Sequence, residues 1–112
     1  MYFGLSEEQS FFKDNVKKYL EDNAPLDSIR HIANGDEKNL SKEIYHGFLN
    51  LGVNGLLIPE EFSGLGLNLL FAAVVSESLG SNTGPIPFIA PYVMAPTAIL
   101  AAGSQEQKQR YL

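Results

Sequence analysis

The carboxylates at two places in the chain are the first candidates for chemistry. Glu60 and Glu61 are adjacent and follow Pro59, whereas Glu77 lies alone in an apolar stretch. Paired carboxylates can serve in acid–base catalysis, and a buried glutamate with a raised pKa can act as a base. However, acidic residues that follow a proline are commonly exposed, and Glu77 can pair with a donor or reach water near a helix C-terminus. We favour these structural interpretations at both places.

The other reactive residue types form no catalytic constellation. His31 and His46 have no acidic partners at metal-ligand spacing, so we interpret each as a lone surface histidine. Cysteine is absent, which excludes a disulfide framework, a zinc-thiolate site and a thiol nucleophile. Residues 64–66 read Gly-Leu-Gly without the basic residue or the strand of a phosphate loop. We therefore predict no catalytic, metal-binding or cofactor-binding residue in the chain.

Composition and charge set further bounds. The 112 residues, of which 45% are hydrophobic and 19% are charged, are expected to form one globular domain. A net charge of −5 argues against a nucleic-acid partner. No secretory signal or Arg-rich transit pattern is visible at the start, and we expect a soluble, cytoplasmic protein. Residues 78–105 are uncharged, but the four prolines within 84–103 argue against a membrane span.

The spacing of apolar and capping residues predicts an all-α bundle of about six helices. Ser6 and Gln9 form a predicted capping box at the start of the first helix. Glycines are expected to end three helices, at residues 35, 52 and 80, and residues 36–39 to form a polar turn. The expected helices span residues 6–23, 26–34, 41–51 and 68–80, followed by a broken helix within 84–103 and a last helix capped by Ser104.

Two segments are unusually apolar. The helix that Asn68 should cap is apolar on all sides from Leu69 to Val75. A helix without a polar face is buried or spans a membrane, and this one is too short to span, so we expect it at the centre of the fold. In the next segment, Pro87 or Pro91 should begin one short helical piece and residues 96–102 a second. This segment is either a kinked core helix or a wall against which an apolar ligand lies.

A glycine-rich loop connects the third helix to the fourth. Residues 51–67 read LGVNGLLIPEEFSGLGL, in which glycine supplies positive φ or close approach and Pro59 stops the preceding element. By composition alone the loop is a tight helix–helix connection. We expect its apolar side chains to pack beneath it: Leu56, Leu57, Ile58, Phe62, Leu65 and Leu67.

Three motifs together resemble the N-terminal helical domain of the acyl-CoA dehydrogenases. The loop at 51–67 and the Glu-Ser-Leu-Gly that ends the next helix at 77–80 are similar to that family's "LG..GLL.PEE(F/Y).GLGL" and "E.LG" motifs. Residues 103–112 resemble its "G(S/T)EEQK.(R/K)YL" segment, and Leu-Ser-Glu-Glu-Gln at 5–9 resembles its opening. The order and the spacing agree, so the resemblance covers essentially the whole chain.

The resemblance implies a FAD-dependent oxidoreductase of lipid metabolism, a flavoprotein that dehydrogenates acyl-CoA thioesters. Such an enzyme has a helical N-terminal domain, a middle β domain and a C-terminal helical domain that supplies a glutamate base. FAD is held mainly by the later domains and a neighbouring subunit. Residues 1–112 are then the N-terminal domain without the other two, and inactive alone. The implied partners are acyl-CoA, an electron-transfer partner and further subunits of a homo-oligomer or a heteromer.

By the same resemblance, the segment after residue 80 supplies part of the wall of the acyl cavity. The implied substrate-binding residues are Ile86, Phe88, Ala90, Tyr92, Val93 and Met94. The prolines in this segment depart from the continuous helix of the common fatty-acid members and resemble members that act on bulky, branched or sterol-derived acyl groups. Two alternatives stay open: a free-standing helical binding module without catalysis, and a related flavin enzyme, either an acyl-CoA oxidase or a flavin monooxygenase.

Overall fold

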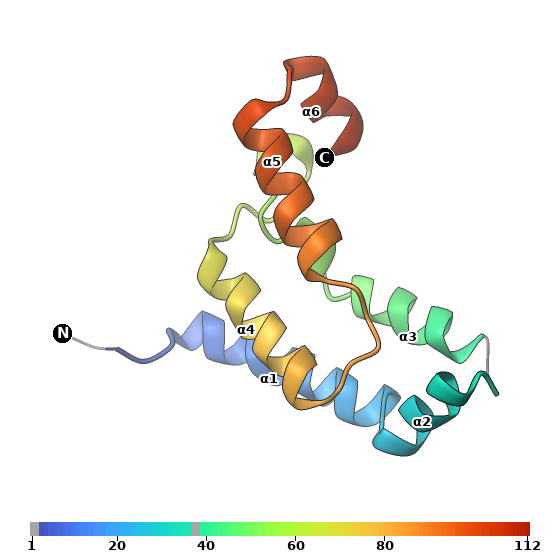
Figure 1. Cartoon of the computed structure of the whole chain (residues 1–112). Coiled ribbons are helices and arrows are strands. Elements are labelled where there is room, and N and C mark those ends of the chain that lie inside the picture. Colours follow the sequence, from blue (N-terminus) through green and yellow to red (C-terminus); the bar gives the residue numbers. More distant parts are fainter. Residues whose placement is uncertain (1–2, 37–38) are drawn as a thin grey trace.

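The computed structural model describes residues 3–36 and 39–112 (Figure 1). These ranges contain six α-helices, two short 3₁₀ turns and one π-helical turn, and no β-strand occurs within them. The predicted all-α class and the number of helices are confirmed. No helix in the described ranges is both long and apolar enough to cross a membrane.

The helices form an open arrangement. The radius of gyration is 15.3 Å, against about 13 Å for a compact domain of this length. α1 lies beside α4, α3 contacts both α1 and α2, and α5 and α6 extend from the body as an arm (Figure 1). The bounds are α1 (Glu7–Asn23), α2 (Leu26–Asn34), α3 (Leu40–Leu49), α4 (Leu69–Ser81), α5 (Ala95–Ala102) and α6 (Gln105–Tyr111).

Local caps begin and end several helices where the sequence predicts. Ser6 Oγ accepts a hydrogen bond from the Gln9 N–H at 3.1 Å, and the Gln9 side chain accepts one from the Ser6 N–H at 3.0 Å. This capping box satisfies two backbone donors at the start of α1. Ser104 and Gln107 form the same device at the start of α6. α2 ends at Gly35, whose φ of 78° lies in the left-handed region that favours glycine.

α3 ends earlier than expected. Its C-cap is Asn50, so the prediction of Gly52 as the cap is wrong. Gly52 instead has a φ of 82° and opens the 3₁₀ turn η1 (Val53–Gly55). Ile44 and Phe48 are buried in the core as predicted. Of the polar turn predicted at 36–39, residues 37 and 38 lie outside the described residues.

The loop at 51–67 folds back on itself through backbone hydrogen bonds. The Leu65 N–H donates to Gly55 O and the Leu67 N–H donates to Leu56 O, each at 2.8 Å. The 3₁₀ turn η2 (Glu60–Phe62) lies in the sequence between these hydrogen-bonded segments of the loop. Of the six apolar side chains expected beneath the loop, Leu56 is fully buried, whereas Leu65 is 44% exposed. The prediction is wrong for Leu65, because its N–H faces the loop interior while its side chain lies near Gly52 at the surface.

α4 is buried on one side only, so the prediction of a central helix surrounded by others is wrong. Asn68 caps the helix as expected, with its Oδ1 accepting from the Leu70 N–H at 3.1 Å. One side of α4 packs against α1. The first turn exposes Leu69 by 62% and Leu70 by 58%. The helix also continues past Gly80, the predicted cap, and ends at Ser81.

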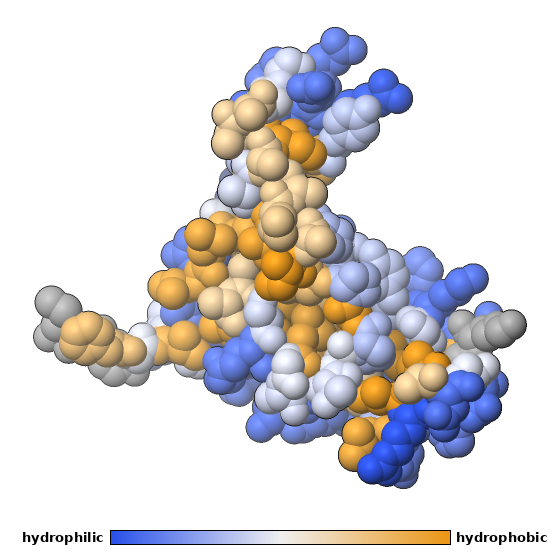
Figure 2. All heavy atoms as spheres, in the orientation of Figure 1, coloured by the Kyte–Doolittle hydropathy of each residue, from blue (hydrophilic) through white to orange (hydrophobic). Residues whose placement is uncertain are grey.

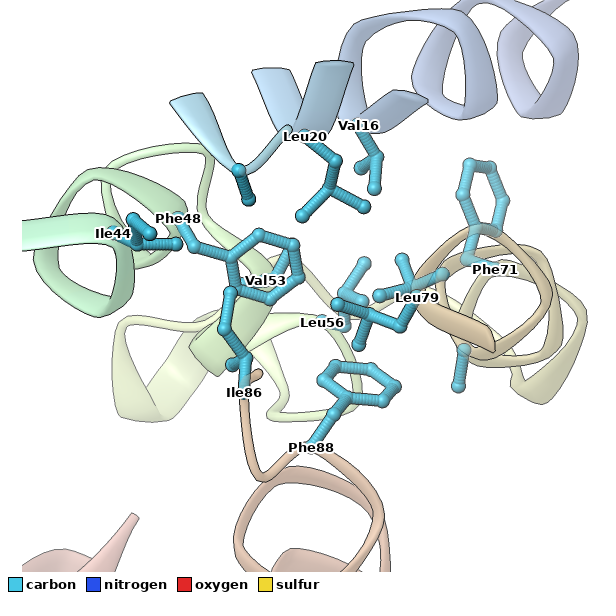
Figure 3. Close-up of a cluster of buried hydrophobic side chains, with 13 residues drawn as sticks. Val16, Leu20, Ile44, Phe48, Val53, Leu56, Phe71, Leu79, Ile86 and Phe88 are labelled. Carbon is cyan, nitrogen blue, oxygen red and sulfur yellow. The ribbon is translucent and has the colours of Figure 1, made fainter. Parts of the chain in front are cut away.

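One apolar core joins α1, α3, the loop and α4 (Figure 3). The ring of Phe48 packs edge-on against Phe88 with centroids 6.5 Å apart, and Phe12 packs edge-on against Phe71 at 6.0 Å. A fully buried side chain of this kind contributes roughly 1.5–3 kcal/mol relative to an exposed one. The core side chains labelled in Figure 3 are Val16, Leu20, Ile44, Phe48, Val53, Leu56, Phe71, Leu79, Ile86 and Phe88.

After an irregular stretch at 82–88, residues 89–102 form one continuous helix with a π turn in place of the predicted break. The π turn η3 (Ala90–Met94) runs directly into α5, which confirms the predicted second piece. Pro96 has no N–H, and in a regular α-helix its ring would collide with the carbonyl four residues earlier. In the π turn the Ala95 N–H donates to Ala90 O, five residues back. The wider turn therefore accommodates Pro96 without ending the helix.

Candidate functional site

The most prominent surface feature of the chain is apolar. Figure 2 shows apolar atoms over the N-terminal part of α4 and along the helix that runs from η3 into α5, on the face toward the viewer. No charged residue occurs from 78 to 105. We call the exposed apolar side chains of these elements the apolar face. Its large members, each between 48% and 64% exposed, are Leu69, Leu70, Ile89 and Met94.

The side chains expected to form an acyl wall lie on both sides of the segment. Ile86 and Phe88 are only 9% and 4% exposed and pack in the core. They pack on the core side of the segment and leave little exposed surface for a ligand to contact. The other four lie together within the π turn, where the first and last are exposed and the middle two are half-buried: Ala90, Tyr92, Val93 and Met94.

Sequence reasoning missed Leu69 and Leu70 as surface residues. The relevant signal is the absence of a polar face on α4, which predicts burial of these side chains in the core of the chain itself. Hydropathy shows that a side chain favours leaving water, but it does not identify what covers it. The two leucines, like Met94, are therefore apolar side chains that the described chain leaves uncovered.

Tyr92 anchors the π turn to α3. Its hydroxyl and that of Tyr45 form a short hydrogen bond in which either oxygen can donate. The Tyr92 ring packs against Phe88 with centroids 6.2 Å apart, and the Tyr45 ring packs against that of His46 at 5.9 Å. Burial, together with the bond to Tyr45, raises the pKa of Tyr92 to about 12. No sequence pattern pairs Tyr92 with Tyr45.

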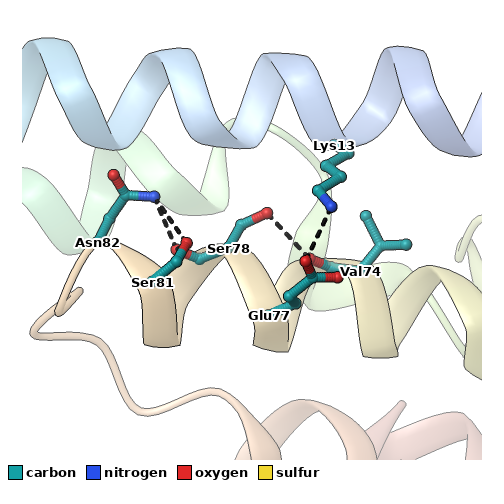
Figure 4. A network of polar contacts seen from close by, with 6 residues as sticks. All are labelled: Lys13, Val74, Glu77, Ser78, Ser81 and Asn82. Carbon is teal, nitrogen blue, oxygen red and sulfur yellow. Dashed lines mark hydrogen bonds and ion pairs between the residues drawn. The ribbon is translucent and has the colours of Figure 1, made fainter.

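Glu77 is paired, as expected, and is not a buried base (Figure 4). Lys13 Nζ of α1 lies 2.9 Å from Glu77 Oε1, and the Glu77 side chain is 65% exposed. Beside it, Ser78 Oγ donates to Val74 O at 2.9 Å, and Asn82 Nδ2 donates to Ser78 O at 2.9 Å. The polar groups at the C-terminal end of α4 are thus engaged in holding the helix and its contact with α1.

The remaining candidate groups are exposed and dispersed. Glu60 and Glu61 lie on the surface in η2, and His31 and His46 are surface histidines, as predicted. His31 Nδ1 lies 3.6 Å from Asp36 Oδ2. Within residues 3–36 and 39–112, no three histidine, aspartate or glutamate side chains gather in a way that could hold a metal ion. The apolar face is therefore the feature that suggests a function.

Known proteins resemble the chain over nearly its whole length. The family model described as "Acyl-CoA dehydrogenase, N-terminal domain" matches residues 6–112. The chain is 29% identical over 111 residues to mitochondrial isovaleryl-CoA dehydrogenase of Bos taurus, which covers 97% of this chain and 26% of that protein. It is 32% identical over 105 residues to the acyl-CoA dehydrogenase IpdE2 of Mycolicibacterium smegmatis, covering 91% of this chain and 32% of that one.

A third relative has a similar degree of identity. The (2S)-methylsuccinyl-CoA dehydrogenase of Cereibacter sphaeroides is 31% identical over 111 residues, covering 97% of this chain and 20% of that protein. No solved structure matches the chain significantly. The chain spans only about a fifth to a third of the length of these three relatives. The match of the family model over residues 6–112 shows that this chain belongs to the acyl-CoA dehydrogenase family, whose N-terminal domain it represents.

Proposed function

We propose that this chain acts as the N-terminal domain of a FAD-dependent acyl-CoA dehydrogenase, and that its π turn forms part of the wall that contacts the acyl group. The observation that carries the proposal is the uncharged π turn, in which Ala90 and Met94 are exposed. Sites for apolar ligands are lined mainly by apolar side chains with few polar groups. The reaction is the α,β-dehydrogenation of the thioester, for which FAD supplies a hydride acceptor.

The described residues do not fit the phosphate groups of FAD or of CoA. Such groups are bound by Arg and Lys side chains or by glycine-rich turns at helix N-termini. The described cations lie on α1, α2, α3 and α6, and residues 43–107 contain no Lys or Arg. We therefore assign FAD, the CoA phosphates, the catalytic base and the contact with an electron-transfer partner to other parts of a longer protein.

A branched acyl group is the substrate that we favour. The names of two relatives specify isovaleryl-CoA and methylsuccinyl-CoA, both of which carry a methyl branch. Ala90 is small and exposed beside the larger Met94, an arrangement that leaves room for a branch. The prolines that accompany the π turn distinguish this wall from a regular helix.

Assembly with further domains or subunits is part of the proposal. Leu69 and Leu70 are more than half exposed at the start of α4. Monomeric proteins rarely leave large contiguous apolar patches uncovered, and burial of one leucine or methionine is worth roughly 1.5–3 kcal/mol. We propose that other domains, or subunits of a homo-oligomer or a heteromer, cover the part of the apolar face that the substrate does not contact.

Expression of the complete reading frame that contains this chain tests the proposed function. We expect the purified protein to bind flavin and to reduce an artificial electron acceptor when an acyl-CoA is added, with branched acyl groups preferred. Formation of hydrogen peroxide in place of acceptor reduction would identify an acyl-CoA oxidase. A protein that retains neither flavin nor acyl-CoA would contradict the proposal and favour a non-catalytic helical module.

A further inference from the structure

The π turn depends on side chains to hold its position. Pro96 removes a backbone donor from within the helix that spans residues 89–102, whereas Pro91 lies in its first turn, where the N–H groups have no partner in the helix. The Ala95 N–H bonds to Ala90 O across the widened turn. Beyond its own helix, η3 contacts η1, and Tyr92 reaches Tyr45 of α3. The orientation of the turn is therefore set from outside the helix.

Two kinds of contact on the inner side can set this orientation. The Phe88 ring packs against Phe48 of α3 at 6.5 Å and against Tyr92 at 6.2 Å. Aromatic packing tolerates a range of offsets and angles, whereas a hydrogen bond requires a defined distance and direction. Among these side-chain contacts, the bond between the Tyr45 and Tyr92 hydroxyls is therefore the one with a defined distance and direction.

We infer that Tyr45 is a positioning residue of the proposed wall: its hydroxyl, acting through Tyr92, sets the rotation of the π turn and thereby the direction that Ala90 and Met94 face. Those two side chains are exposed, while Tyr92 is half-buried against the core. Tyr45 lies on α3 and is hydrogen-bonded to Tyr92 of the wall. The inference rests on the proposed function for its consequence, but the conformational step can be tested without any substrate.

Amide hydrogen exchange of the 112-residue chain tests this step. The Ala95 N–H makes the defining bond of the π turn, so its exchange rate reports opening of the turn. We expect Tyr45→Phe to raise that rate about fivefold, the equilibrium factor of one neutral hydrogen bond. The exchange of core amides in α1, such as that of Leu20, should not change. An unchanged Ala95 rate would overturn the inference.

Tyr19→Phe is the matched control, because it also removes one tyrosine hydroxyl from a contact with α3. Tyr19 donates to Ile44 O at 2.7 Å, and its loss should leave Ala95 exchange unaltered. Tyr92→Phe should reproduce the effect of Tyr45→Phe, and the double variant should exceed neither, because both changes remove the same bond. Multiplied effects in the double variant would show that the two residues act independently.

Methyl NMR reports the direction of the wall itself. The chain has two methionines, Met1 and Met94, so methyl-labelled methionine gives one signal from the turn. Tyr45→Phe should shift the Met94 signal and Tyr19→Phe should leave it in place. In the complete protein, isovaleryl-CoA should also shift this signal and free CoA should not. A Met94 signal of the wild-type protein that does not shift when isovaleryl-CoA is added would count against the proposed wall. Whether Tyr45 positions the turn is decided separately, by the exchange data.

Discussion

The phenol ring of Tyr19 lies across Gly47, so that α1 and α3 meet where α3 has no side chain. The Tyr19 hydroxyl donates to Ile44 O of α3 at 2.7 Å, and burial raises the pKa of Tyr19. A Cβ atom placed on Gly47 would lie 2.9 Å from Tyr19 Cζ and would overlap the hydroxyl. The glycine therefore permits the hydrogen bond that joins the two helices.

Gly47→Ala should destabilise the chain by about 1–2 kcal/mol. Replacing glycine by alanine inside a helix normally stabilises it by up to about 1 kcal/mol, but overpacking costs roughly 1–3 kcal/mol. Here the ring must move and its hydrogen bond is lost. Urea unfolding of the variant and the wild type shows whether the free energy of unfolding falls or rises. Gly80→Ala in α4 is the control, because nothing lies within 4 Å of the added Cβ, and it should be neutral or stabilising. A stabilised Gly47→Ala variant would contradict this account of the α1–α3 contact.

Glu77→Gln should change stability by less than about 1 kcal/mol. The Lys13–Glu77 pair is close, at 2.9 Å, but the Glu77 side chain is 65% exposed, and exposed ion pairs contribute little. The small effect should shrink further in high salt, where exposed charges are screened. Unfolding curves of the variant and the wild type at low and high ionic strength measure this salt dependence. A loss of several kcal/mol would mean that Glu77 is buried by contacts that the described chain does not show.

Alkaline pH should weaken the contact between α3 and the π turn. The pKa of Tyr92 is raised from 10.0 to about 12, so the folded state favours its protonated form. This contribution is fully present below pH 10 and is lost as the pH rises from 10 to 12. Stability followed by circular dichroism should fall in that range. The stability of the Tyr45→Phe/Tyr92→Phe variant should fall less steeply with pH, although titration of Tyr19 still contributes to its fall. Equal pH slopes for the variant and the wild type would exclude a role for the tyrosine pair.

The helix ends and the anchor of the π turn show where sequence reasoning succeeds and where it stops. The capping box of Ser6 and Gln9 is local, because three residues of spacing determine it, and the structure confirms it. The π turn is not local: Pro96 signals a break, and Tyr92 in the turn that avoids the break is hydrogen-bonded to Tyr45, far away in the sequence. The exposure of Leu69 is not evident from the sequence for a related reason, since hydropathy does not identify which contacts cover a side chain.

The isolated chain should not retain FAD. Residues 43–107, which include the apolar face, contain no Lys or Arg. A diphosphate that leaves water without a positively charged partner loses hydration that nothing compensates. Equilibrium dialysis of the purified chain against FAD should show no micromolar binding, and acyl-CoA should not bleach the flavin. Yellow protein that keeps its flavin through gel filtration would place a cofactor site in this domain.

The substitution Ala90→Phe in the complete protein tests the acyl wall most directly. The larger side chain should fill space equivalent to a few methylenes of substrate, each worth about 0.8 kcal/mol. The account predicts that kcat/KM falls tenfold or more for long or branched acyl-CoA thioesters and changes little for short straight ones. As a control, Ala33→Phe on the exposed surface of α2 should leave kcat/KM unchanged for both classes of substrate. An equal loss for short, long and branched substrates would show that Ala90 supports the fold and does not line the acyl site.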